Sequence, residues 1–358
     1  MQRIAEDTGV LLRVTGGDRD LFARGTSEAI ANKPLGSGMA DDSIQKFQTF
    51  LLFLRHFYDL VLAERDDSSE EKLILALLRE QAALLRTPAP RSLSPDLCLT
   101  VRKRLFNAWN SETVARMNSN FDVEVRVITN QWKPVQAYYA LYFLLAAVHE
   151  IHQPGRRHAH ETTLRFATST IGQKLPKPWC CQYDFDNGQC VAFPWANLPH
   201  VMPGWNISRY TPAEDFVANL LRTTGEEKQR ERWREHYKGK HKRNPAGHAR
   251  AGKLVRTSDM QVGVISFWDV LWRLRKWVNY KEAEAMLEGQ DLEGAHEFDA
   301  ALNSILTTSA TVLENLLNSL LGSARMNEMY DCFLTTVGGK VDLSHLKLRR
   351  DLICGVPF

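Results

Sequence analysis

The chain has 358 residues, of which 44% are hydrophobic and 24% are charged, so it has the composition of a globular protein with one large or two moderate domains. Its most apolar run, residues 137–148, is 12 residues long and too short to span a bilayer, and the N-terminus lacks the apolar core of a signal peptide. The six cysteines do not have the dense spacing of a disulfide scaffold. We therefore expect a soluble cytoplasmic protein with reduced thiols, which excludes membrane proteins and small secreted domains.

Basic charge is concentrated in one segment of the chain. The formal net charge is only +3, but residues 226–256 contain eleven Lys and Arg against four Glu, a net of +7 that leaves −4 for the rest of the chain. A local excess of this kind indicates a local binding surface for anions rather than a property of the whole protein.

The N-terminal part is predicted to be an irregular segment followed by helices. Residues 1–41 are rich in Gly, Asp and Ala and end in the breaker cluster NKPLGSG, so we expect irregular structure there. Residues 42–109 have apolar side chains at three- and four-residue spacing, which predicts an N-terminal helical region. Its second helix is expected to begin with a capping box formed by Ser68 and Glu71.

Residues 110–173 are predicted to form the first part of a helical bundle. In QWKPVQAYYALYFLLAAVHEIH, residues 131–152, Pro134 suits the first turn of a helix because its missing N–H costs nothing there. The residues that follow it are apolar on nearly every face, which places this helix in the centre of a bundle.

Residues 174–262 are predicted to be an irregular insertion rich in Pro and Trp. Asn187-Gly188 predicts a small β-hairpin with a two-residue type I′ turn. A helix is expected from Thr211 through Leu221, because a cap, a proline and a box acid follow one another at its start. The basic segment comes next, helical at first and then broken by NPAG.

Residues 263–322 are predicted to complete the bundle, so that the fold is mainly α. SFWDVLWRLRKWVNYKEAEAML, residues 266–287, is typical of a helix, and a long amphipathic helix follows it. On a regular helix Arg275, Asn279 and Glu282 form one polar row. Residues 323–358 are assigned to a C-terminal tail, whose alternating pattern predicts a terminal strand.

A small polar pocket is predicted between two of these helices. Tyr138, Tyr142 and His149 share one stripe of the central helix, and packing of the two helices would bring this stripe beside Arg275. The alternative is ordinary packing, in which Arg275 pairs with a carboxylate such as Glu282 and the tyrosines are core aromatics.

The order of these elements resembles the HEPN superfamily. The resemblance rests on the P-x-x-A-Y-Y-A-L-Y-x-L helix that starts at Pro134, the basic and His-rich turn after it, the R-x-x-V-N-Y sequence of residues 275–280 and the final long helix, about a third of the chain. Some YaaC-like proteins open their central helix in a similar way. HEPN domains are helical bundles of prokaryotic toxin–antitoxin, phage-defence and CRISPR-associated proteins, and many are metal-independent ribonucleases.

The resemblance implies a site on the penultimate helix of the bundle. The family's Arg corresponds to Arg275, and the polar and aromatic positions after it correspond to Asn279 and Tyr280. Catalytic members have a His four to six residues after the Arg, and this chain has none there, which puts cleavage by the usual route in doubt. Two hypotheses follow: an RNA-binding or RNA-cleaving effector of antiviral defence or a toxin system, or a non-catalytic homodimeric subunit that binds a protein of a defence operon or a nucleic acid.

The basic segment is the predicted nucleic-acid site. Trp233 and Tyr237 lie between its cations, as aromatic side chains do in sites for single-stranded RNA. The expected contacts to phosphate are Arg234, Lys238, Lys240, Lys242, Arg243 and His248. The alternative is a flexible, solvated loop.

No cofactor and no metal is expected. Three cysteines, Cys180, Cys181 and Cys190, with His200, invite a zinc interpretation, but adjacent cysteines are poor joint ligands and no C-x2-C pair is present, so buried thiols are favoured. The RRHAH cluster of residues 156–160 lies at a helix start that could bind an anion, but a solvated basic helix start is the favoured interpretation. No phosphate-binding loop, nucleophile elbow or dinucleotide fingerprint occurs in the sequence.

Overall fold

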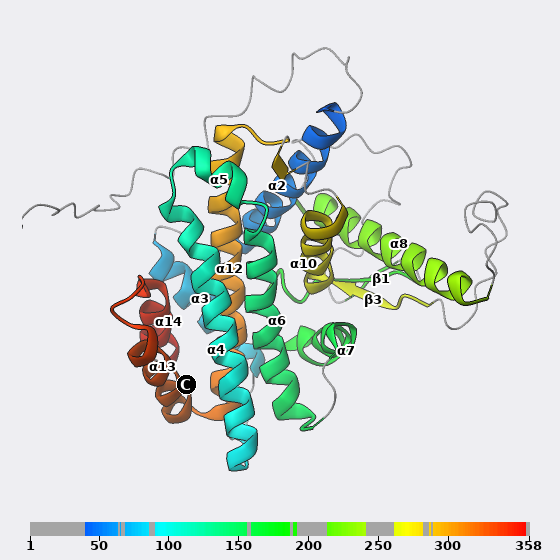
Figure 1. The fold of residues 1–358 in the computed structure, drawn as a ribbon. Coiled ribbons are helices and arrows are strands. Elements are labelled where there is room, and N and C mark those ends of the chain that lie inside the picture. Colours follow the sequence, from blue (N-terminus) through cyan, green and yellow to red (C-terminus); the bar gives the residue numbers. More distant parts are fainter. Residues whose placement is uncertain are drawn as a thin grey trace, which may run out of the picture.

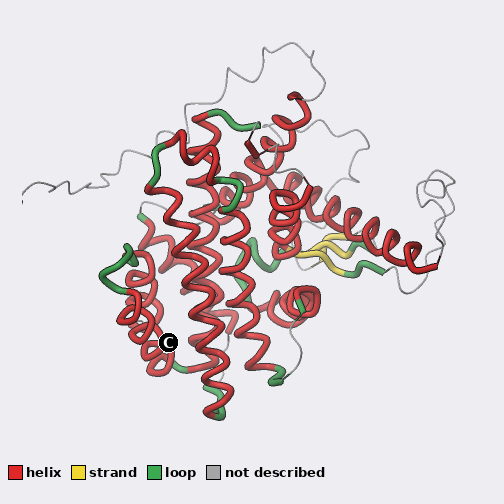
Figure 2. Tube along the Cα trace, in the orientation of Figure 1, coloured by secondary structure: helices red, strands yellow, loops and turns green. Residues whose placement is uncertain are grey.

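The computed structural model describes residues 40–63, 65, 69–85, 90–155, 159–186, 189–191, 213–240, 261–281, 286–287 and 289–355, with the backbone alone at 40–42, 189–191, 236–240 and 280–281. Helices dominate these residues (Figures 1 and 2), which confirms the predicted mainly α fold. The helices are α2 (Ala40–Leu62), α3 (Glu70–Leu85), α4 (Pro95–Met117), η1 (Asn118–Asn120), α5 (Val123–Thr129), α6 (Lys133–His152), α7 (His160–Phe166), η2 (Ala167–Ile171), η3 (Gly172–Lys174), α8 (Ala213–Lys240), α10 (Phe267–Lys276), η5 (Trp277–Lys281), α12 (Leu292–Leu321), α13 (Ser323–Val337) and α14 (Ser344–Gly355). The strands are β1 (Gln182–Asp184), β2 (Gln189–Val191) and β3 (Val264–Ser266).

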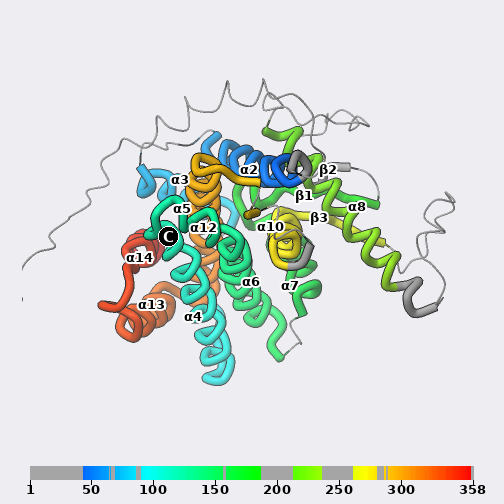
Figure 3. The backbone as a smooth tube through the Cα atoms, turned by 45° about the horizontal axis from the view of Figure 1, so that its top comes forward, coloured from blue at the N-terminus to red at the C-terminus, as the bar shows by residue number. Residues whose placement is uncertain are grey.

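The centre of the fold is a bundle in which α4, α6 and α12 run side by side (Figures 1 and 3). Sixteen of the 20 residues of α6 are buried, because this helix is apolar on nearly every face and packs against both α4 and α12. The prediction that it is a central bundle helix is confirmed. On its far side α6 meets α10, which carries Arg275.

The N-terminal helices belong to the same hydrophobic core as the bundle. Phe57 of α2 stacks on Phe267 of α10 with ring centroids 4.0 Å apart, and Phe47 contacts Phe298 of α12 at 5.6 Å. α4 runs continuously across the boundary predicted at residue 109. Residues 42–109 therefore contribute layers of the bundle rather than a separate region.

Two local predictions are wrong in detail. The cap of α3 is Ser69, whose hydroxyl accepts a hydrogen bond from the backbone N–H of Lys72 at 3.2 Å, while Ser68 lies outside the described residues. The hairpin is present, but Asp184 pairs with Gln189, so four residues connect β1 and β2 instead of two. The turn residues 187–188 lie outside the described part of the chain. β3 pairs with β1 to give the order β2-β1-β3, beside α8 in Figure 1.

The C-terminal tail is helical, and the terminal strand predicted for it is wrong. Leu343 and Leu346 are buried at the start of α14, in the three-residue spacing of a helix. Arg349, also fully buried, donates to both oxygens of Glu112 at 2.6 Å and to those of Glu314 at 2.8 and 2.9 Å. These bonds attach α14 to α4 and α12 through the middle of the core.

Candidate functional site

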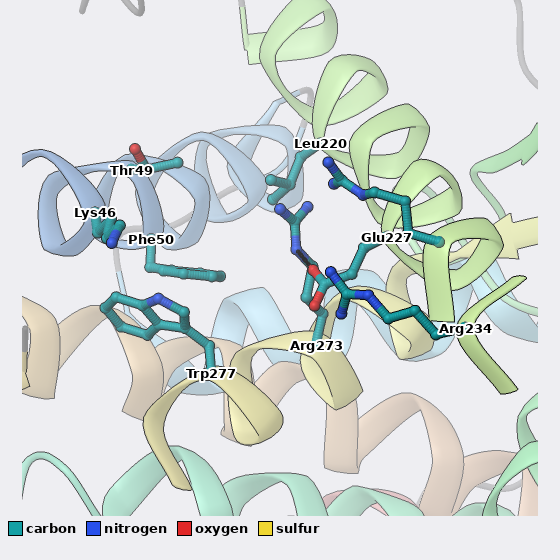
Figure 4. Close-up of a pocket in the computed structure, with 9 residues that line it drawn as sticks. Lys46, Thr49, Phe50, Leu220, Glu227, Arg234, Arg273 and Trp277 are labelled. Carbon is teal, nitrogen blue, oxygen red and sulfur yellow. Dashed lines mark ion pairs between the residues drawn. The ribbon is translucent and has the colours of Figure 1, made fainter. Parts of the chain in front are cut away.

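A pocket of about 370 Å³ lies between α2, α8 and α10 (Figure 4). Its lining residues are Lys46, Thr49 and Phe50 of α2; Leu220, Glu227, Arg230 and Arg234 of α8; Arg273 of α10; and Trp277 at the start of η5. Four cations face one carboxylate, which gives the lining a formal net charge of +3. An opening with this charge is suited to an anionic group.

Two aromatic side chains form one wall of this basic pocket. Figure 4 shows the side chains of Phe50 and Trp277 next to each other. Their ring centroids lie 4.4 Å apart and their planes are tilted by 39°. Phe50 is 5% exposed and Trp277 is 7% exposed, so most of the surface of both rings is buried. The wall fixes α2 against η5 and makes one side of the pocket apolar.

Arg273 is the cation whose position is fixed most firmly. Its Nε donates to Glu227 Oε2 at 2.6 Å, and its Nη1 donates to the hydroxyls of Thr223 and Thr224 at 2.9 and 3.2 Å. Burial lowers the pKa of Arg273 below its ordinary value, and the Glu227 carboxylate opposes this shift. A guanidinium in such a pair remains charged at neutral pH and is oriented before any ligand arrives.

The cations of α8 alternate between two roles. Arg230 and Arg234, one helical turn apart, are exposed at the pocket. Lys228 forms an ion pair with Asp269 of α10, and Arg232 Nη2 lies 2.5 Å from Glu161 Oε1 of α7. One face of α8 is therefore held by ion pairs while the other offers positive charge.

Arg234 is the residue of the predicted nucleic-acid set that the structure places in the pocket. Lys238 and Lys240 lie at the end of α8, which continues well past the end predicted at Leu221, so this part of the basic segment is a helix and not a loop. Three further predicted contacts, Lys242, Arg243 and His248, lie outside the described residues. The stacking role predicted for Trp233 is wrong, because this side chain is only 9% exposed.

Arg275 projects from a different side of α10, toward two tyrosines of α6. Its guanidinium carbon lies 5.4 Å from the ring centroid of Tyr138 and 5.2 Å from that of Tyr139, which is the range of a cation–π interaction. The predicted proximity of Arg275 to this stripe of the central helix is present, and Tyr142 stacks beside Tyr138 with centroids 5.9 Å apart.

His160, the first residue of α7, completes this aromatic–histidine cluster. Its Nδ1 lies 2.9 Å from the hydroxyl oxygen of Tyr138, and its ring stacks on Tyr142 at 4.3 Å. Burial and the nearby charge of Arg275 lower the pKa of His160 below its ordinary value, so the ring is neutral at pH 7. Burial raises the pKa of Tyr138 well above its ordinary value, although Arg275 opposes the shift, so its hydroxyl stays protonated.

The other predicted site residues are placed differently. His149 is buried two to three turns further along α6, where it stacks on Phe166 with centroids 4.3 Å apart. Asn279 is half-buried in η5, a π-helical turn that begins at residue 277, so the regular wheel that aligned it with Arg275 does not apply there. The side chain of Tyr280 and all of Glu282 lie outside what the structure describes.

Sequence reasoning missed His160, Arg230 and Arg273 as members of these groups. The RRHAH cluster did mark the start of α7 as basic, but only the packing of α7 against α6 brings its last His to Tyr138. Arg273 is buried beside a carboxylate of another helix, and no local pattern marks such a pair.

Among the described residues, no group of three or more His, Cys, Asp and Glu side chains is placed to hold a metal ion. None of the helices in the described ranges is both long and apolar enough to cross a membrane. No protein-family model, curated protein or solved structure matches the chain. Function is therefore inferred from the geometry of the basic pocket and the aromatic–histidine cluster.

Proposed function

We propose that the chain binds single-stranded RNA through the basic pocket and the exposed face of α8. The observation that carries this proposal is the pocket's net charge of +3, concentrated around Arg230, Arg234 and Arg273. Phosphate groups are the anions that such sites take in nucleic-acid-binding proteins, and the Arg fork matches their oxygens. The basic residues beyond Lys240 continue the same charge along the sequence.

The salt dependence of RNA binding tests this proposal. In fluorescence anisotropy with a labelled mixed-sequence RNA of about a dozen nucleotides, replacing both Arg230 and Arg234 by Ala removes two phosphate contacts. The slope of log K against log salt should then fall by about 1.4, at about 0.7 per contact for single strands, and the affinity should drop at least tenfold at low salt.

The matched control removes equal charge from another helix. Arg102 and Lys103 are exposed on α4, and their double Ala variant should bind as the unmodified chain does. Equal losses in the two double variants would indicate diffuse attraction to the whole protein. An unchanged slope in the Arg230/Arg234 variant would refute RNA binding at the pocket.

RNA cleavage at the aromatic–histidine cluster is a second candidate, which we propose because His160 brings an imidazole to Arg275 from another helix. The HEPN-like resemblance supports a ribonuclease of antiviral defence or a toxin system, and the sequence lacks a His just after Arg275. In this proposal α7 supplies the missing ring, 2.9 Å from Tyr138, which is itself under the Arg275 guanidinium.

The cluster has the groups that cleavage through the ribose 2′-hydroxyl requires. In this proposal His160 Nδ1–H donates to the hydroxyl oxygen of Tyr138, so Nε2 is the unprotonated nitrogen and takes the 2′-hydroxyl proton as the 2′ oxygen forms a bond to phosphorus. The bond from phosphorus to the 5′ oxygen breaks and the leaving oxygen takes a proton from water. The hydroxide that this leaves takes the proton from the His160 imidazolium, and a 2′,3′-cyclic phosphate remains. Arg275 stabilises the charge that develops on the phosphoryl oxygens.

Single variants decide between cleavage and its absence. Arg275→Ala and His160→Ala should each reduce the rate by about 100-fold or more, while the exposed controls Arg165→Ala and His296→Ala leave it unchanged. Cleavage products ending in 2′,3′-cyclic phosphate, absent with 2′-deoxy substrate, would identify the chemistry.

An unmodified chain that binds RNA without cutting it would favour the alternative function, a non-catalytic interaction subunit. One observation supports that alternative: Ile128 of α5 is 64% exposed and Trp132, just before α6, is 55% exposed. Exposed apolar side chains of this size are typical of protein-binding surfaces. Light scattering of the purified chain would report whether it forms the predicted homodimer.

A further inference from the structure

The basic side chains of α8 divide into those with a carboxylate partner and those without one. Ion pairs with Glu226, Asp269 and Glu161 hold three of them, which are Arg222, Lys228 and Arg232. Arg230 and Arg234 form no ion pair with a residue that the structure describes, and both line the basic pocket. The cations of α8 whose charge is left for a ligand are therefore those at the pocket.

Like charges lie close together at this pocket. Burial is the largest cause that lowers the pKa of Arg273, and the charge of Arg230 adds to the shift, so these two guanidinium groups repel each other. Glu227 is the one carboxylate among the described residues that line the pocket, and it is already bound to Arg273 at 2.6 Å. An anion between the guanidinium groups would relieve their repulsion, and the Arg fork matches the oxygens of a phosphate.

The space between α2 and α8 is closed on one side of the pocket and open on the other. On the closed side Phe216 of α8 packs on His56 of α2 with ring centroids 4.9 Å apart, and Phe216 is only 1% exposed. In the other direction α8 continues past Arg234 to Lys240 and diverges from α2 (Figure 1). A strand that enters between the two helices from the open side therefore stops at the pocket.

The charge of α8 changes along the helix in the same sense. Glu214 and Asp215 are in its first turn, on the closed side of the pocket. Lys238 and Lys240 are at its other end, on the open side. A polyanion is attracted to the second half of the helix and repelled by the first turn. Shape and charge together favour the end of a strand at the pocket over an internal segment.

We propose that the basic pocket holds a terminal phosphate monoester of the RNA, and that the strand continues from it along the exposed face of α8. This inference rests on the proposed RNA binding and identifies the part of the strand that occupies the pocket. A terminal monoester carries a charge of about −1.5 to −2 at pH 7, whereas each phosphodiester inside a strand carries one negative charge. The monoester therefore balances more of the net charge of +3 in the lining.

Competition binding with three RNA strands of one sequence tests this inference. The strands differ only in their ends, which are hydroxyl at both, phosphate at the 5′ end or phosphate at the 3′ end. Each competes with an internally labelled strand in fluorescence anisotropy on the full-length chain. At about pH 7.5 one phosphate-ended strand should bind about tenfold tighter or more than the hydroxyl-ended strand, because it adds charge-assisted hydrogen bonds, and its identity shows which end is held. The preference should shrink at about pH 5.5, where protonation removes the second charge of the phosphate.

Single variants locate the preference. Arg230→Gln and Arg234→Gln should each reduce it to less than about threefold, whereas Arg102→Gln, which removes an exposed cation of α4, should keep it. Equal affinity of the three strands, in a chain whose RNA binding depends on Arg230 and Arg234, would overturn the terminal site and leave the proposed function standing. A preference that persists in both pocket variants would also overturn the terminal site. A chain that binds none of the strands would refute the proposed function and this inference together.

Discussion

The buried guanidinium of Arg349 permits a quantitative prediction of stability. Arg349→Met keeps most of the side-chain length but removes four charge-assisted hydrogen bonds to Glu112 and Glu314, and leaves both carboxylates in a site with no exposed surface. Removing one partner of a buried ion pair costs about 3–5 kcal/mol. A domain of comparable size loses about 2–4 °C per kcal/mol, so the melting temperature should fall by roughly 6–20 °C.

The neighbouring residue Arg350 is the matched control for this measurement. Its side chain is 31% exposed and contacts Asp331 at 2.9 Å, so Arg350→Met should cost less than about 1 kcal/mol. Both variants would be compared by thermal unfolding followed by circular dichroism at 222 nm. If Arg349→Met melts within about 2 °C of Arg350→Met, the buried bonds do not hold α14 in the core and the reasoning is refuted.

Three further predictions concern the fold. In a urea titration, Gly225→Ala should destabilise the protein by about 1–2 kcal/mol despite the better helix propensity of Ala, because the new Cβ would lie 2.3 Å from the Phe185 ring. Gly355→Ala should be neutral in the same titration, because nothing lies within 4 Å of its new Cβ. Asp291→Ala should cost about 1 kcal/mol, because the carboxylate caps α12. Burial raises the pKa of Glu112, but Arg349 and Arg116 outweigh it and hold the pKa well below 4.5, so the free energy of unfolding should decline as the pH falls below about 4.5.

The bundle could be predicted from the sequence because the patterns that indicate its helices are local. The run from Pro134 to Leu145 has apolar residues on every face, and only a helix surrounded by other helices buries all of them. The C-terminal tail was misassigned for the opposite reason. Arg349 occupies a core position of α14, and a charged residue there breaks the apolar pattern unless its partners, Glu112 and Glu314, are already known.

The candidate sites were harder to predict from the sequence because tertiary packing brings their residues together. Arg275 and Tyr138 were singled out from helix faces, and the structure brings them together. His160 comes from a helix start whose sequence indicated only basic charge. Asn279 was aligned with Arg275 on a wheel of 100° per residue, and the π-helical turn at residue 277 changes that rotation.

The geometry of α10 makes the two candidate sites independent of each other. Residues two apart on a helix point about 200° apart, so Arg273 faces α8 and the basic pocket while Arg275 faces the tyrosines of α6. If both proposals hold, binding at the first site and cleavage at the second can be lost separately, and a defect in one carries no implication for the other. Both sites depend on the position of α10. Reciprocal hydrogen bonds between Ser266 and Asp269 fix the start of this helix. Its apolar side is buried against α2 and α6. A change that moves α10 should impair both sites together, whereas a change at either Arg should not.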